Sequence, residues 1–337
     1  MSEKLAAIKA YQPDTGDYQI RADANESFID LPVEMKQTLA IRLSKIKLNR
    51  YPDPYAIELR RSAAEYYGVN LQNIAPGNGS DELIGVILGS LLKKGAKLCV
   101  AAPDFSMYNF YAHMSELEVV TTEKTDLKIS KDALIEAAKG ADMLIFSNPC
   151  NPTGQALAPV EVLEIVQSLS CPVVVDEAYM EFYGQSVIPY IGQHKNLIVL
   201  RTCSKAIGLA AARIGFAISN PETTADIMKA KSPYNISSLD QTMAQAVLLE
   251  TEYIQRCVKS ILDSKKHLLG LLKPLGFEII ETQTNFLLLR AQNTAELHKH
   301  LAKNGVSVRL IMDNCLRITA AKPQDNIRIA GLLSQLK

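Results

Sequence analysis

The chain has 337 residues, and its 36 Lys+Arg and 36 Asp+Glu residues give a formal net charge of zero, which excludes a broad basic surface for nucleic acid or an anionic membrane. At about 150 residues per domain this length predicts two domains, and 47% hydrophobic with 21% charged residues is typical of an ordinary globular protein. Six cysteines without a C-x-x-C pair indicate a reducing, cytoplasmic compartment, and no secretory signal or stretch of about 20 apolar residues for a membrane span is visible.

Helix-like and strand-like patterns alternate between residues 81 and 220. We expect helices at 81–94, 131–139 and 159–169, the last beginning with a proline at its first position. Short apolar strands separated by helices predict an α/β fold whose large domain holds a mainly parallel, helix-covered sheet. Ligands of such sheets bind at the carboxyl ends of the strands. The strands are expected at 98–101, 119–122, 143–146, 173–175, 198–200 and 214–218.

The pattern changes after Pro233, where a long periodic stretch runs from about residue 239 to 272 and ends at a Pro and Gly terminator, 273–276. Strand-like runs at 277–281, 286–290 and 307–319 and a helix near 294–303 then indicate a smaller α+β domain. We predict an N-terminal arm at 1–26, a large cofactor-binding domain at 27–237 and a small C-terminal domain at 238–337.

Two of the expected strands run directly into polar groups. Asn151 lies in the Asn-Pro-Cys-Asn-Pro-Thr-Gly turn at 148–154, although a single Asn-Pro step is most often only a loop. Asp176 and Tyr179 follow the apolar strand at 173–175. A carboxylate at the end of a buried strand is costly unless it meets a cation or a strong donor, whereas an isolated acid there is more often a helix cap.

A third expected strand leads into the segment Arg-Thr-Cys-Ser-Lys-Ala-Ile-Gly at 201–208, with Arg213 close behind. Lys205 taken alone is most simply a solvated surface lysine. Placed among small residues after an apolar strand, it can instead be a desolvated amine with a lowered pKa, the state that forms Schiff bases.

The segment Gly-Asn-Gly-Ser-Asp-Glu at 77–82 opens the helix expected from residue 81. Gly79, Ser80 and Asp81 let backbone N–H groups approach an anion, although simple capping by Ser80 explains an isolated turn equally well. The sequence thus offers an anion site with Arg213 as counter-ion, an amine, Lys205, for an aldehyde, and a carboxylate, Asp176, for a ring nitrogen. Together these groups are typical of a site for pyridoxal phosphate. Phe105 follows the strand at 98–101 and is an aromatic that can cover the ring.

These segments, together with Asp-Ala-Asn-Glu at 23–26 and Arg-Tyr-Pro-Asp-Pro at 50–54, occur in the order found in a known family. The sequence resembles the fold-type-I, aspartate-aminotransferase-like pyridoxal-phosphate enzymes, and within them most resembles the histidinol-phosphate aminotransferases. The resemblance covers nearly the whole chain. It implies amino transfer in two half-reactions, and a homodimer in which Tyr51 reaches the phosphate in the neighbouring subunit.

The resemblance also assigns roles to single residues. Lys205 would form the internal aldimine and move the proton, Asp176 would pair with the ring nitrogen, and Tyr179 would bond the ring oxygen. The positions implied for the cofactor are Gly79, Ser80, Asp81, Phe105, Asn151, Asp176, Tyr179, Thr202, Ser204, Lys205, Arg213 and Tyr51.

Two arginines mark the predicted substrate end. Arg309 and Arg317 lie on strand-like pieces joined by a short turn, and paired N–H donors from two arginines suit a dianionic phosphate. In the family the position of Arg317 binds a carboxylate, which the histidinol-phosphate branch replaces with a phosphate ester. The implied substrate positions are Tyr11, Asn25, Tyr51, Asn151, Arg309 and Arg317.

We therefore expect amino transfer from histidinol phosphate to 2-oxoglutarate, a step of histidine biosynthesis, with no nucleic-acid, membrane or metal partner; His298 and His300 have no third ligand in view. Two alternatives stay open on the same scaffold, a threonine-phosphate decarboxylase and an aromatic amino-acid aminotransferase. A regulator that only senses the cofactor is disfavoured, because about 25 residues before the family match are too few for a helix-turn-helix unit.

Overall fold

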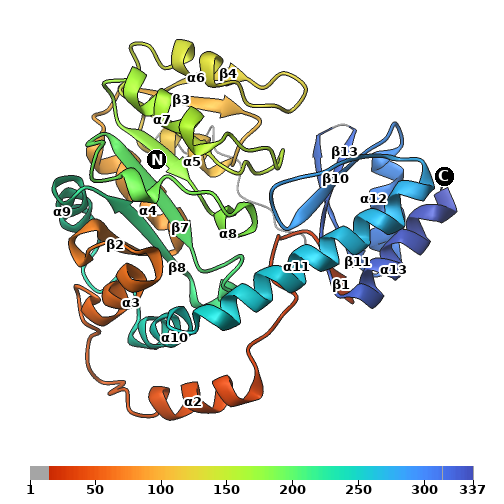
Figure 1. The fold of residues 1–337 in the computed structure, drawn as a ribbon, viewed down its shortest axis with the longest axis horizontal. Coiled ribbons are helices and arrows are strands. Elements are labelled where there is room, and N and C mark those ends of the chain that lie inside the picture. The colour runs from red at the N-terminus through yellow and green to blue at the C-terminus, as the bar shows by residue number, and fades with distance from the viewer. Residues whose placement is uncertain (1–14, 313, 337) are drawn as a thin grey trace, which may run out of the picture.

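The structure, a computed structural model, describes residues 15–312 and 314–336. Its central feature is a seven-stranded sheet with the order β2-β8-β7-β6-β5-β3-β4, in which β8 alone runs antiparallel to its neighbours (Figure 1). The predicted α/β fold with a mainly parallel sheet is therefore confirmed. The strands of this sheet are β2 (Ile74–Asn78), β3 (Lys97–Ala102), β4 (Glu118–Glu123), β5 (Met143–Ser147), β6 (Val173–Asp176), β7 (Leu197–Thr202) and β8 (Ile214–Ser219).

Helices cover both faces of the large sheet because its strands are apolar on both sides. Along β7, Leu197 and Val199 enter one buried cluster while Ile198 and Leu200 enter the other, as the period of two in a strand requires. The first cluster includes residues of α3 (Ile57–Tyr67), α6 (Lys131–Ala137), α7 (Pro159–Ser168) and α10 (Ser238–Leu248). The second includes residues of α4 (Gly79–Leu91), α5 (Met107–Met114) and α9 (Pro221–Ala230).

A second layered unit follows the long helix α11 (Thr251–Leu272), which runs from the large sheet to the C-terminal region (Figure 1). Its four-stranded antiparallel sheet has the order β12-β13-β10-β9. The strand β1 (Ile20–Arg21) pairs in parallel with β11 (Val306–Ser307), which joins the N-terminal segment to this unit. The remaining elements are β9 (Glu278–Ile280), β10 (Phe286–Arg290), α12 (Thr294–Lys303), β12 (Arg309–Met312), β13 (Cys315–Thr319) and α13 (Pro323–Leu333).

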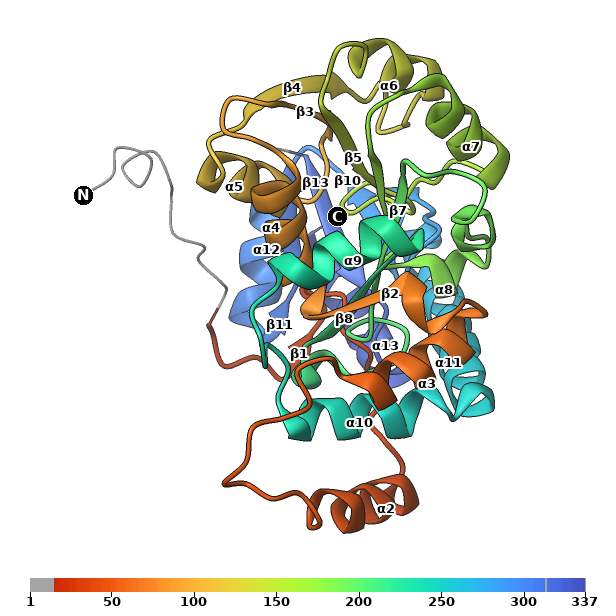
Figure 2. The same cartoon turned by 90° about the vertical axis from the view of Figure 1, so that its left-hand side faces the viewer.

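Two short helices lie outside these layers. The helix α8 (Met180–Tyr183) directly follows the end of β6. The helix α2 (Val33–Leu43) stands away from the sheet at the end of two long connections (Figures 1 and 2). It exposes apolar side chains, with Val33 64% and Ile41 61% exposed, so this helix presents an apolar surface that residues 15–312 and 314–336 do not cover.

Three of the differences between the structure and the sequence-based expectation concern the long helical stretch, the strand β2 and the start of α4. The periodic stretch at 239–272 forms two helices, because the chain breaks at 249–250 between α10 and α11. The strand β2 was not predicted, since its sequence Ile-Ala-Pro-Gly-Asn contains two residues that are disfavoured in strands. The helix α4 begins at Gly79 with Asn78 as its N-cap, so the alternative that Ser80 caps this helix is wrong.

The proposed division at residues 26 and 237 stays a prediction. By packing, α10 contributes Ala244 and Val247 to the core of the large sheet, and the chain passes to the smaller unit along α11. Within the described residues, no helix is both long and apolar enough to cross a membrane, and no group of three His, Cys, Asp or Glu side chains is placed to hold a metal ion.

Candidate active site

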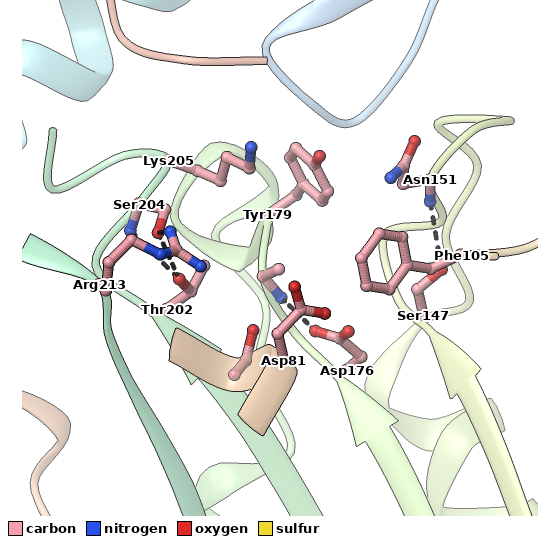
Figure 3. Close-up of a pocket in the computed structure, with 12 residues that line it drawn as sticks. Asp81, Phe105, Ser147, Asn151, Asp176, Tyr179, Thr202, Ser204, Lys205 and Arg213 are labelled. Carbon is pink, nitrogen blue, oxygen red and sulfur yellow. Dashed lines mark hydrogen bonds between the residues drawn. The ribbon is translucent and has the colours of Figure 1, made fainter. Parts of the chain in front are cut away.

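Polar side chains from separate loops meet at the carboxyl ends of β5, β6 and β7. They line a cavity of about 130 Å³ that adjoins a wider outer pocket of about 450 Å³. Phe105, Asn151, Tyr179 and Lys205 line both spaces, so the two form one cleft. The inner cavity is lined by Ser80, Asp81, Phe105, Ser147, Asn151, Asp176, Ala178, Tyr179, Thr202, Ser204, Lys205 and Arg213 (Figure 3).

One end of the inner cavity is a seat for an anion. Ser80 and Asp81 lie in the first turn of α4, where backbone N–H groups and the helix dipole favour negative charge. A Cβ at Gly215 would lie 2.2 Å from the backbone nitrogen of Ser80, and a Cβ at Gly79 would lie 2.8 Å from Arg213 Nη2. Glycine at both positions therefore brings β8 and Arg213 against the start of the helix.

Hydroxyl groups complete this end of the cavity. Arg213 Nη1 donates to Ser204 Oγ at 3.2 Å, and Thr202 Oγ1 donates to the same oxygen at 3.1 Å (Figure 3). Asp81 has a buried oxygen, Oδ1, without a hydrogen-bond partner among the described residues. Burial raises the pKa of the Asp81 carboxyl, although the positive charges of Arg213 and Lys205 oppose this shift.

Asp176 lies at the floor of the cavity as the last residue of β6. Its carboxylate accepts a hydrogen bond from Tyr108 Oη at 2.9 Å and another from the backbone nitrogen of Ala178 at 3.1 Å. Burial raises the pKa of this carboxyl to about 7, and both hydrogen bonds oppose the rise because they stabilise the charged form. The site thus holds a buried acid that can form an ion pair with a bound cationic ring.

Lys205 lies at the opposite side of the cavity, near its opening (Figure 3). Its Nζ donates to the backbone oxygen of Ala24 at 2.8 Å. Burial lowers the pKa of the amine to about 8, and the positive charge of Arg317 contributes to the shift. The structure therefore supports a desolvated amine at this position and not a solvated surface lysine.

Asn25 connects the N-terminal segment to this site. Its Nδ2 donates to Tyr179 Oη at 2.8 Å, and its Oδ1 accepts from Thr319 Oγ1 at 2.9 Å. Asn285 Nδ2 donates to the backbone oxygen of Asn25 at 3.0 Å. Asn25 adopts a left-handed conformation, φ 54°, and its hydrogen bonds to Thr319, Asn285 and Tyr179 hold the phenol of Tyr179 at the cavity.

Two arginines line the outer pocket. Arg309 and Arg317 face each other across β12 and β13, which places two positive charges on neighbouring strands. Arg317 donates hydrogen bonds to Asn151 Oδ1 and to the backbone oxygen of Asp23. Like charges at directly opposed strand positions are unfavourable, so this arrangement indicates an anionic ligand between them.

Phe105 lies beside residues to which the sequence analysis assigned no role. Tyr108 contacts it edge to face, with ring centroids 5.7 Å apart. Asp104, beside it in the chain, pairs with the buried Lys124 at 3.2 Å and accepts a hydrogen bond from Ser147. Tyr108 lies in α5, whereas Phe105 precedes the N-cap of that helix, Ser106, so periodicity alone does not predict their contact.

The structure thus gathers most of the predicted positions in one cleft. Gly79 does not line the cleft but lies directly against the Arg213 side chain. Tyr51 is an exception: it is 82% exposed and stacks on Tyr234 with ring centroids 4.6 Å apart, outside the cleft. Tyr11 lies outside the described residues, so its predicted contact with substrate stays a prediction.

The residues of the inner cavity fit pyridoxal phosphate by their chemistry. The helix start, two hydroxyls and Arg213 suit its phosphate, and Asp176 suits a protonated pyridine nitrogen. A charged Asp81 carboxylate has no proton to donate to a phosphate, so the backbone N–H is the suitable donor at this residue. Lys205 is the amine available for the aldehyde.

The chain is similar to known proteins over nearly its whole length. Residues 16–330 match the family model described as aminotransferase class I and II. The chain is 39% identical to a histidinol-phosphate aminotransferase of Clostridium novyi (strain NT), over 97% of this chain and 94% of that protein. It is 34% identical to a histidinol-phosphate aminotransferase of Pyrococcus furiosus, over 99% of this chain and 97% of that protein.

Solved structures share the fold over the whole chain. A histidinol-phosphate aminotransferase from Sinorhizobium meliloti in complex with pyridoxal-5'-phosphate has a TM-score of 0.91 at 23% identity, covering 100% of this chain and 98% of that one. An aspartate aminotransferase from Thermus thermophilus with maleate has a TM-score of 0.85 at 18% identity, covering 100% and 99%. These two likenesses establish the fold.

Proposed function

This chain belongs to the class I and II aminotransferase family and is a pyridoxal-phosphate-dependent aminotransferase, and we propose that its amino donor is histidinol phosphate and its amino acceptor 2-oxoglutarate. The products are imidazole-acetol phosphate and glutamate, which makes the reaction a step of histidine biosynthesis. The observation that carries this choice of substrate is the nearly full-length match, at 33–39% identity, to relatives named histidinol-phosphate aminotransferase.

We propose that the cofactor lies along the inner cavity. The backbone N–H groups of Ser80 and Asp81, the hydroxyls of Thr202 and Ser204 and the guanidinium of Arg213 would hold its phosphate. Asn151 and Tyr179 would bond the ring oxygen, and Phe105 would cover the ring. When bound, the cofactor supplies an aldehyde that takes up the amino group and a ring that withdraws electrons from the substrate α-carbon.

The protein residues then control two protons. Asp176, once paired with a cationic ring nitrogen, stays ionised and keeps the proton on that nitrogen, because an opposite charge nearby lowers the pKa of a carboxyl. Lys205 Nζ, whose pKa burial lowers to about 8, would accept the proton from the substrate α-carbon and return it to the cofactor. The role of Tyr179 is to fix the ring orientation through the hydroxyl that Asn25 holds.

The outer pocket supports a phosphorylated donor. Arg309 and Arg317 lie opposite each other on β12 and β13, and a dianionic phosphate between them offsets their mutual repulsion better than one carboxylate. Arg317 is 9% exposed and so acts from a desolvated position, where its attraction for an anion is strong. The same pair can bind the dicarboxylate acceptor in the second half-reaction.

We also propose a homodimer in which Tyr51 reaches the phosphate seat of the partner subunit. Tyr51 is 82% exposed, and its stacking on Tyr234 holds the ring outward. An open pocket of about 630 Å³ beside Asp81, Tyr111 and Arg213 leads to the phosphate seat from outside. The exposed apolar residues of α2 offer additional surface for such an interface.

The cofactor absorbance of the loaded protein tests this function. Glutamate and histidinol phosphate should each convert the aldehyde form of the bound cofactor into the amine form, in the absence of any second substrate. No absorbance change with either compound would contradict the assignment. Release of carbon dioxide from phosphothreonine without an oxo acid would indicate the decarboxylase, and preferential transfer from phenylalanine or tyrosine would indicate the aromatic aminotransferase.

A further inference from the structure

One acidic side chain in the outer pocket has an oxygen that nothing in the described chain satisfies. Asp23 follows β1 and is 8% exposed. Its Oδ2 lies 3.6 Å from Arg21 Nη2, whereas its Oδ1 is buried and has no hydrogen-bond partner among the described residues. A buried acceptor without a donor is unfavourable, so a ligand that brings a donor to this oxygen gains binding energy.

Because Asp23 lines the outer pocket, a ligand bound there can donate a hydrogen bond to its Oδ1. Asp23 lines this pocket together with Lys205, Arg309 and Arg317. Arg317 donates to its backbone oxygen, which fixes the residue beside the proposed phosphate site. The other acid on the wall, Asp104, already has partners in Lys124 and Ser147, so Asp23 is the carboxylate with unused acceptor capacity.

The proposed donor substrate has three polar parts. Its amino group reacts at the cofactor and its phosphate suits the paired arginines, which leaves the imidazole ring and its N–H groups. We propose that Asp23 is a specificity-determining residue that accepts a hydrogen bond from the imidazole N–H of the amino donor, an inference that rests on the proposed function. The dicarboxylate acceptor offers no N–H and brings a further negative charge to this wall, so Asp23 favours the donor over the acceptor.

The isosteric substitution Asp23→Asn tests the inference through the apparent dissociation constants of the two half-reactions, each followed by cofactor absorbance. For histidinol phosphate the constant should rise about tenfold or more, because a hydrogen bond to a charged acceptor is replaced by one to a neutral amide. For glutamate it should stay unchanged or fall, because a repulsive charge is removed. For 2-aminopropyl phosphate, which keeps the amine and phosphate but lacks the ring, it should stay unchanged or fall.

The dissociation constant should rise for histidinol phosphate but stay unchanged or fall for the two ligands without a ring. This difference separates recognition of the ring by Asp23 from a merely structural role. Asp23→Ala should reproduce the pattern, and Asp126→Asn, at an exposed carboxylate outside the pocket, should alter none of the three constants. If all three ligands weaken by the same factor, Asp23 only supports its neighbours and the inference is overturned. If the wild-type protein responds to histidinol phosphate but the variant binds it equally well, the inference alone fails; if the wild-type protein does not respond, the proposed function fails with it.

Discussion

At the scale of single residues, the protonation of Asp176 depends on a neighbour in a different part of the chain. Burial raises the pKa of this carboxyl to about 7, even though its hydrogen bonds oppose the rise. Tyr108 opposes the shift by donating a hydrogen bond from α5, and it also packs edge to face on Phe105. One side chain therefore supports both the acid below the proposed ring and the aromatic that covers it.

Tyr108→Phe should weaken cofactor binding by about ten- to hundredfold at pH 7, because a hydrogen bond to a charged group contributes about 1.5–3 kcal/mol. Without the phenol donor the pKa of Asp176 rises further. Asp176 is then protonated at a higher pH, so the loss of cofactor affinity on acidification should begin at higher pH in the variant. Equilibrium titration of the cofactor-free protein with pyridoxal phosphate from pH 6 to 9 measures both effects.

Tyr66→Phe is the matched control, because it removes a half-buried phenol oxygen from α3 outside the cleft. It should leave the affinity and its pH dependence unchanged. Equal loss of affinity in the two variants would show that Tyr108 acts through general stability and not through Asp176.

At the scale of elements, the anion seat exists because β8 and α4 touch through backbone atoms. Gly215 on β8 lies against Gly79 and Ser80 at the start of α4, and a Cβ on Gly215 would lie within 2.8 Å of three backbone atoms of those two residues. The contact sets the distance between Arg213, which directly precedes β8, and the first turn of α4. Sequence reasoning identified both segments but not the strand β2 that pairs with β8 and leads into the helix.

Gly215→Ala should lower the free energy of unfolding by about 1–3 kcal/mol, because backbone atoms cannot move aside as a side chain would. It should weaken the binding of pyridoxal phosphate more than that of pyridoxal, since the displaced groups face the phosphate. Urea denaturation and cofactor titration measure these effects.

Gly270→Ala provides the contrast for this substitution. Gly270 is exposed within α11, and a Cβ there would have no neighbour within 4 Å. This variant should gain about 0.5–1 kcal/mol from helix propensity and keep its cofactor affinity. A Gly215→Ala protein that is as stable as wild type would contradict the backbone contact as the cause.

At the scale of the whole molecule, the described residues leave apolar side chains exposed on one side of the large unit. The helix α2 and the segment around Tyr51 extend from the body and expose Leu48, Tyr51 and Tyr55 at 82%, 82% and 62% (Figure 2). A stable monomer rarely exposes apolar side chains so close together. The proposed homodimer would bury them and would place Tyr51 beside the phosphate seat of the partner.

Mixed dimers test whether Tyr51 acts across the interface. Lys205→Ala and Tyr51→Ala homodimers should each have low amino-transfer activity, and subunit exchange between them should restore activity toward half of the wild-type value per mixed dimer. The restored site combines Lys205 from one chain with Tyr51 from the other. If Tyr51 acts within its own chain, the mixed dimers contain no intact site and activity stays low, and a monomer in sedimentation would contradict the dimer itself.

The sequence by itself predicted six of the seven strands of the large sheet and the polar groups at the ends of three of them, but not β2. Asp176 and Lys205 were predictable because an apolar strand that runs directly into a charged residue is a local pattern, and parallel strands end at a common edge. The helix break at 249–250 was not predictable from periodicity, since both halves of that stretch bury an apolar face in helical register.

Only the tertiary structure decided which distant groups act on these residues. Tyr108 lies 68 positions from Asp176, and Asn25 lies 154 positions from Tyr179, yet both pairs are joined by hydrogen bonds. The burial of Asp23 Oδ1 without a hydrogen-bond partner among the described residues is likewise visible only in the tertiary structure. Hydrogen bonds and desolvation depend on distances in space, which chain spacing does not specify. The sequence therefore predicted which groups line the cleft, while the fold decided their hydrogen-bond partners and the burial that shifts their pKa values.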